Sequence, residues 1–194
     1  MTRKLLLGIV LLVAPLAGSV LLSCTKDDGC RIGNVARYYT ITGLALAASR
    51  QTTGASPGPN EPVPAPDLLL SVQLQTTYYG YQSAPSGGWL PAAYACPPTP
   101  APGYLGTRQP LDSVVIRSRF AYDAAHPAGA SLNDLLLDTE TGQEFSPRGN
   151  QAYAPRLRFK TSPAQAGPQQ FRVRYRLGTG EIYTAETPVL QLTR

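Results

Sequence analysis

Apolar and polar residues alternate along several stretches of this 194-residue chain, and such alternation is typical of half-buried β-strands. The clearest case is 171–177, where Phe, Val, Tyr and Leu alternate with three arginines. Aromatic and β-branched residues support the strand assignment elsewhere. The further strands predicted from these patterns are 37–46, 68–79, 112–120, 154–160 and 189–192.

A hairpin is predicted after the strand over 171–177. Residues 178–179, Gly-Thr, suit a two-residue turn with glycine first, and the chain would return through 181–184. This turn would place Arg176 opposite Glu181.

The inward side of two further strands is predicted from the same period of two. The residues expected to face the core are Leu68, Leu70, Val72, Leu74, Leu157 and Phe159. Residues 131–137 predict a short helical turn capped by Ser131, with a strand as the alternative. Short strands with at most one short helix predict an all-β fold, an antiparallel β-sandwich of immunoglobulin-like type.

Glycine and proline separate these strands. The chain has 18 glycines and 19 prolines, about 19 % of its residues, which lies above the average of about 12 % and below the disordered range of about 25–30 %. They concentrate in 50–67 and 83–110, which predicts long, proline-stiffened loops.

The N-terminus has the three-part layout of a secretory signal peptide. Arg3 and Lys4 form a positive head, an apolar run follows over 5–20, and small residues precede Cys24. A transmembrane helix is the alternative. The apolar run is at the short limit of the roughly 20 residues needed to span a bilayer, and Pro15 interrupts it.

Residues 21–24, Leu-Leu-Ser-Cys, resemble the lipobox of bacterial lipoproteins. The resemblance implies cleavage between Ser23 and Cys24 and acylation of Cys24, which would anchor the chain in a membrane. Several acyl chains give stable anchoring where a single one does not. The alternative is an ordinary signal peptide with a chance cysteine.

The residues after Cys24 resemble the surface-export signal of Bacteroidota lipoproteins, here Lys26, Asp27 and Asp28. This implies an outer-membrane lipoprotein facing the cell exterior. A solvated tether on the periplasmic face is the alternative. We therefore expect a signal peptide over 1–23, a lipidated tether over 24–33 and one domain over 34–194.

Two cysteines remain after the lipid site. Cys30 and Cys96 would lie in an oxidising compartment, which favours a disulfide; two separate thiols are the alternative. Two distant cysteines and one histidine do not form a zinc site, so no metal is expected. Without residues 1–23 the chain has 15 basic and 12 acidic residues, a net charge of +3, which argues against nucleic acid as a partner.

The mature chain is similar to a family of uncharacterised Bacteroidota lipoproteins known only as a domain of unknown function. The features that carry the resemblance are Cys24 with Lys26-Asp27-Asp28, Cys30, the strand 39–44, the turn 131–134 and the hairpin over 171–192. The resemblance implies a cellular localisation and a fold, and it implies no reaction or ligand.

Catalytic residues are sparse. His126 is the only histidine, and no glycine-flanked nucleophilic serine accompanies it, so we expect no Ser-His-Asp triad, no enzyme and no cofactor. Asp134 and Asp138 would share one side of a helix, which is more often only a solvated side. Asp123 and the acidic segment 138–140 offer oxygen ligands for calcium, but without the spacing of a calcium loop.

Cations gather on one side of three predicted strands. If the strands are neighbours, one outer face would carry eight of them: Arg117, Arg119, Arg156, Arg158, Lys160, Arg172, Arg174 and Arg176. Such a face suits the phosphates or carboxylates of lipopolysaccharide or acidic glycans. The alternative is a solvated face whose arginine stems cover apolar surface.

Aromatic residues gather in the predicted loops: Tyr78, Tyr79, Tyr81, Trp89, Tyr94 and Tyr104. These rings suit contact with carbohydrate or protein, or the packing of long loops. The candidate ligand contacts are Trp89, Tyr94, Tyr104, Arg172, Arg174 and Arg176.

We expect a lipid-anchored, non-catalytic binding or structural module that contacts a glycan or an envelope protein. The alternatives are an accessory subunit of an envelope nutrient-uptake complex and, third, a hydrolytic enzyme.

Overall fold

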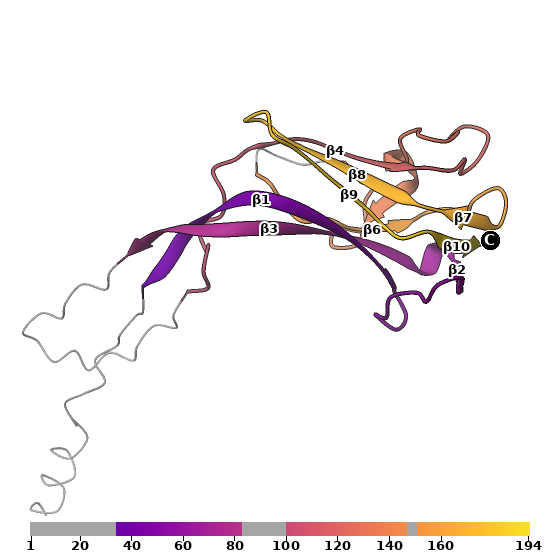
Figure 1. Ribbon diagram of the computed structural model, residues 1–194, viewed down its shortest axis with the longest axis horizontal. Helices are drawn as coiled ribbons and strands as arrows, with labels where there is room; N and C mark the ends of the chain where they lie inside the picture. Colours follow the sequence, from indigo (N-terminus) through magenta and orange to yellow (C-terminus); the bar gives the residue numbers. More distant parts are fainter. Residues whose placement is uncertain (1–33, 83–99, 147–150) are drawn as a thin grey trace, which may run out of the picture. The chain divides into compact units, whose positions relative to one another are not determined.

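A computed structural model of the chain describes residues 34–82, 100–146 and 151–194 (Figure 1). Its contacts divide the chain into two units, one made of Met1–Val35 and Gln82–Pro100 and the other of Ala36–Tyr81 and Ala101–Arg194. The sheets belong to the second unit. In the described ranges no helix is long and apolar enough to cross a membrane.

The fold is all-β, with three sheets. The first sheet has the order β1 (Val35–Arg50), β3 (Leu68–Gln82), β6 (Arg156–Phe159), β5 (Leu136–Asp138). The second has the order β4 (Leu111–Ser118), β8 (Phe171–Leu177), β9 (Ile182–Glu186). The third has the order β2 (Pro62–Pro64), β10 (Leu190–Thr193), β7 (Gly167–Gln169). Two single 3-10 turns, η1 (Ala65–Asp67) and η2 (Asn133–Leu135), join them.

The first and second sheets face one another across a shared core, as in a sandwich (Figure 1). The alternation predicted for β8 is confirmed: Phe171, Val173, Tyr175 and Leu177 are fully buried, and the three arginines between them are exposed. The inward residues predicted on β3 and β6 are confirmed as well, except that Leu74 is only partly buried. The period of two therefore identifies the core side of each of these strands.

The hairpin loop has one residue more than the two-residue turn that the sequence predicts. The Leu177 N–H donates to the Glu181 carbonyl at 2.9 Å, so the loop has three residues and ends at Gly180, whose φ is +104°. A three-residue hairpin loop commonly needs glycine at such a position. The register moves accordingly, and Arg176 lies opposite Ile182 rather than Glu181.

The proline-rich stretch after β1 was predicted to be only an exposed loop, and this was wrong. It contains β2 and η1, and it buries Val63 and Ala65 completely. β2 pairs in parallel with β10, with Val63 opposite Leu192. It lies at the edge of its sheet, where proline is tolerated because one side of the strand needs no N–H donor.

The predicted helical turn near Ser131 is a 3-10 turn, and strand β5 follows it at once. The N-cap position is Leu132 and not the predicted Ser131, whose Oγ accepts only a long 3.4 Å contact from the Asn133 N–H. Instead, the Asn133 amide bonds to β4: its Oδ1 accepts from the Ile116 N–H at 2.9 Å, and its Nδ2 donates to the Val114 carbonyl at 2.8 Å. The turn is thereby fixed against the second sheet.

Candidate functional site

The outer face of the β4–β8–β9 sheet carries a row of cations along its central strand. Pairing aligns three cross-strand rows on this face: Arg117–Arg172–Glu186, Val115–Arg174–Thr184 and Ser113–Arg176–Ile182. We call the four exposed arginines in these rows the arginine face: Arg117, Arg172, Arg174 and Arg176. They point outward because the alternate residues of β8 fill the core.

The predicted face of eight cations is not formed. Arg156 and Arg158 belong to β6, which lies in the first sheet beside β3 and β5, and Lys160 directly follows that strand. Lys160 is paired with Glu144 at 2.8 Å. Strand order depends on contacts distant in sequence, and for this reason a shared polarity pattern did not reveal the separation.

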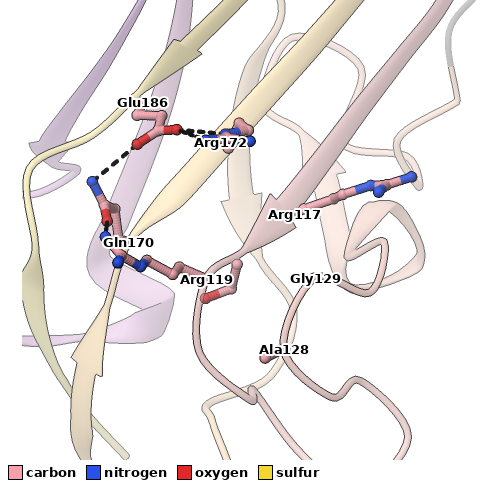
Figure 2. Close-up of a pocket in the computed structure, with 8 residues that line it drawn as sticks. Arg117, Arg119, Ala128, Gly129, Gln170, Arg172 and Glu186 are labelled. Atoms are coloured by element: carbon pink, nitrogen blue, oxygen red, sulfur yellow. Dashed lines mark hydrogen bonds and ion pairs between the residues drawn. The ribbon is translucent and has the colours of Figure 1, made fainter.

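A pocket of about 580 Å³ lies at the end of the arginine face where β8 begins (Figure 2). It is lined by Arg117, Ser118, Arg119, Ala128, Gly129, Gln170, Arg172 and Glu186. Three guanidinium groups and one carboxylate therefore line it, an excess of two positive charges.

Glu186 organises one side of the pocket. Its Oε1 accepts from Arg172, and its Oε2 accepts from the Gln170 amide at 3.2 Å. Arg119 reaches the Gln170 Oε1 at 3.4 Å (Figure 2). This chain of contacts holds Arg119 and Arg172 on the same side, and each guanidinium keeps N–H donors that these contacts do not use.

Arg117 lies directly across the strand pair from Arg172. Like charges in such a position destabilise a sheet. The Arg117 side chain extends away from Arg172 and Glu186 (Figure 2). Over residues 34–82, 100–146 and 151–194, neither the Arg117 nor the Arg174 side chain has a hydrogen-bond or ion-pair partner, although both residues pair through their backbones. Both are thus available to an anion from outside the chain.

The loop after β4 forms the other wall of the pocket. The Gly129 N–H donates to the Ser118 carbonyl at 2.8 Å, and the Arg119 N–H donates to the Gln170 carbonyl at 2.9 Å. Ser118 in turn donates to Gln169 at 2.5 Å. These bonds fix both ends of the loop to β4 and to the segment before β8.

His126 holds the middle of this loop. Its Nδ1 lies 2.8 Å from Asp123, and its Nε2 lies 3.0 Å from Asp134, while only 13 % of its side chain is exposed. The hydrogen bond to Asp123, together with that to Asp134, raises the pKa of His126, and the same bond lowers the pKa of Asp123. Both ring nitrogens form hydrogen bonds within the fold, so the histidine links the loop to Asp134.

The acidic residues considered for other roles are separated. Asp134 lies in η2 and Asp138 in β5, so they do not share a helix side. The Asp138 carboxylate accepts from the Glu140 N–H at 2.9 Å, a local turn contact. In the part of the chain that the structure describes, no three His, Cys, Asp or Glu side chains are grouped to hold a metal ion.

The predicted aromatic set is only partly visible. Trp89 and Tyr94 lie outside the described residues. Tyr78, Tyr79 and Tyr81 lie on β3 rather than in a loop. With Tyr38, Tyr104, Leu105 and Arg108 they form what we call the tyrosine surface, near the start of β1 and the end of β3.

The residues of the predicted lipid site and export signal and the predicted disulfide pair also lie outside the described ranges: Ser23, Cys24, Lys26, Asp27, Asp28, and Cys30 with Cys96. Sequence reasoning missed Gln170, Glu186 and the loop wall of the pocket. The proximity of Glu186 to Arg172 follows from the pattern only if the hairpin loop has three residues, because the predicted two-residue turn places Ala185 opposite Arg172.

Comparison with protein-family models, with curated proteins and with solved structures found no match to this chain.

Proposed function

We propose that this chain is a lipid-anchored, non-catalytic binding module of the bacterial outer membrane, facing the cell exterior, that holds anionic groups in the arginine-lined pocket. The observation that carries the proposal is the pocket itself, which is lined by three arginines and only one carboxylate. Guanidinium groups bind carboxylate, sulfate and phosphate through charge-assisted, often bidentate hydrogen bonds. The lipobox resemblance at Cys24 and the acidic pair at Asp27 and Asp28 support the address.

The pocket is suited to binding rather than to chemistry. Its polar side chains are arginine, glutamine, serine and one glutamate that is already paired with Arg172. His126 lies in the neighbouring loop, and its ring is bonded to Asp123 and Asp134. The arrangement supplies positive charge and hydrogen-bond donors in a fixed geometry, which is what recognition of an anion requires.

The test is anion-specific stabilisation of the full chain in neutral detergent. A ligand that binds only the folded state raises the unfolding temperature with its concentration. We expect sodium sulfate to raise it more than sodium chloride does at equal ionic strength. Arg117→Gln should reduce this difference to the general stabilisation that sulfate gives any folded protein, and Arg156→Gln, an exposed arginine of the first sheet, should keep all of it. An equal sulfate effect in all three chains would contradict the proposal.

The proposed location on the cell exterior is tested on intact cells. Protease added outside should remove the mature domain of the wild-type protein and spare a variant with Asp27→Ala and Asp28→Ala. Protection of both chains would place the domain on the periplasmic face and would overturn the export part of the proposal.

A second candidate function is partner docking in an envelope nutrient-uptake complex. The tyrosine surface favours it, because five of the seven large hydrophobic side chains exposed in the described residues lie there: Tyr78, Tyr79, Tyr81, Tyr104 and Leu105. Clustered exposed apolar groups mark contact surfaces. Cross-linking from Tyr81 or Tyr104 in whole cells should capture one defined envelope protein if this surface docks a partner.

A further inference from the structure

The cations of the arginine face continue beyond the pocket in a regular row. Arg172, Arg174 and Arg176 occupy alternate positions of β8. Alternate residues of an antiparallel strand are about 7 Å apart, so the row extends about 14 Å from its first to its last Cα. A single small anion in the pocket would leave most of this row unused.

The three arginines differ in their existing partners. Arg172 is paired with Glu186, and Arg176 lies 3.5 Å from Asp112. Asp112 lies at an irregularity in β4, where the register shifts between Leu111 and Ser113. Such bulges redirect a side chain out of the regular alternation. Arg174 has no such partner in the described chain and lies between Val115 and Thr184.

The face therefore offers two adjacent places for negative charge. One is the pocket, with Arg117, Arg119 and Arg172. The other is Arg174, one strand period of about 7 Å from Arg172. This side of the sheet has five arginines, counting Arg119, and two carboxylates, Asp112 and Glu186. The excess is three positive charges.

The other residues on this face indicate the chemical class of the ligand. The outward residues beside the arginines are Ser113, Val115, Ile182, Thr184 and Glu186. None is aromatic, so the bases of a single-stranded nucleic acid would find no ring to stack on. Thr184 provides a hydroxyl next to the cations, which suits the hydroxyl groups of a sugar, and the Ser113 hydroxyl, which already donates to Asp112 at 3.1 Å, can accept from one.

We infer that the ligand is a linear acidic polysaccharide: the carboxylate or sulfate of one sugar enters the pocket, and the charged group of a following sugar lies over Arg174. This inference rests on the proposed function, because it requires the pocket to hold an anion. It adds that affinity depends on the number of linked sugars and that Arg174 contributes to binding only when the ligand has more than one charged group.

The experiment is a calorimetric titration of the full chain in detergent with galacturonate, tetragalacturonate and a sulfated tetrasaccharide. We expect a tetramer to bind the wild-type chain at least about fivefold more tightly than the monomer, about 1 kcal/mol at 25 °C. The tetramer that binds more tightly identifies carboxylate or sulfate as the preferred group.

Arg174→Gln should lose the higher affinity for the tetramer and keep the affinity for the monomer. Arg117→Gln should weaken both, and Arg156→Gln should weaken neither.

The outcomes separate this inference from the proposed function. Equal affinity for monomer and tetramer would overturn the polysaccharide and leave the anion pocket standing. Binding of tetraglutamate or of an oligothymidylate of equal charge as tightly as the saccharide would overturn the assignment to sugars. Failure of every anion, inorganic sulfate included, would overturn both.

Discussion

The arginine face and the tyrosine surface are both exposed, but they differ in how fully their groups satisfy one another. Tyr38 stacks on Tyr79 with ring centres 5.6 Å apart, and the Arg108 guanidinium lies 4.5 Å from the Tyr38 ring centre. On the arginine face, the side chains of Arg117 and Arg174 have no partner in the described chain. Exposure alone is thus a poor guide to a binding site.

The two regions also lie apart. β1 begins and β3 ends at one side of the sheets, whereas β8 begins at the other side, beside β7 (Figure 1). A change in one region should therefore leave the other undisturbed, since distant sites are usually additive. The tyrosine surface should respond in stability and the arginine face in binding.

The largest effect on stability is expected at Gly103, beneath the tyrosine surface. Its φ is +75°, and an added Cβ would lie 2.9 Å from both the Tyr39 and the Tyr78 rings. Gly103→Ala should lose about 1–2 kcal/mol through backbone strain and about 1–3 kcal/mol more through overpacking. Urea unfolding measures the sum, and the sulfate effect on the variant should match the wild type.

Gly142→Ala is the matched control. Gly142 has a φ of +67° and nothing within 4 Å of the added Cβ, so only the backbone strain applies. Equal losses of stability in the two variants would show that the tyrosine rings are not packed as described.

A charge reversal at Arg117 should separate binding from stability. Arg117→Glu replaces a like pair with an opposite pair across from Arg172, which should raise the free energy of unfolding by about 0.2–1 kcal/mol. The same change should reduce stabilisation by sulfate to the general salt effect that needs no binding site. Thermal unfolding with and without sulfate measures both, beside Arg156→Glu as control. A variant that loses stability, or one that keeps the sulfate effect, would contradict the arrangement of the pocket.

The smallest effect is a pH dependence of the loop wall. The pKa of His126 is raised, so its contribution to stability is complete below its unfolded pKa of about 6.5 and is lost as the pH rises through the folded value. The pKa of Asp123 is lowered, so its contribution is present above about pH 4 and is lost as the pH falls through the folded value.

Urea unfolding between pH 5.5 and 8.5 should therefore show stability declining with pH in the wild type. His126→Gln should remove that decline, because His126 is the only histidine in the chain. A decline that persists unchanged in His126→Gln would assign the pH dependence to other groups.

The fold class and the buried sides of β3, β6 and β8 are predictable from the sequence because they depend on a local period of two. β2 is not, because proline marks loops and edge strands alike. The pocket is less predictable still. Its salt bridge between Arg172 and Glu186 depends on a hairpin loop of three residues instead of two, and one residue of register changes every cross-strand neighbour.

The separation of the cations into two sheets is also outside the reach of local patterns. Arg158 alternates with apolar neighbours just as Arg174 does, yet its strand pairs with β3 and β5. Only long-range pairing decides which basic strand joins which sheet. The loop wall depends likewise on Asp123 and Asp134 meeting at His126, a contact that sequence spacing does not specify.

The most direct test of the anion pocket follows the arginine side-chain N–H signals by NMR while inorganic sulfate is added to the full chain in detergent at constant ionic strength. The pocket predicts saturating shifts for Arg117, Arg119 and Arg172, with little change at Arg156 and Arg158. Small, non-saturating shifts spread over all arginines would mean that the cations only attract counterions, and the proposed binding function would fail.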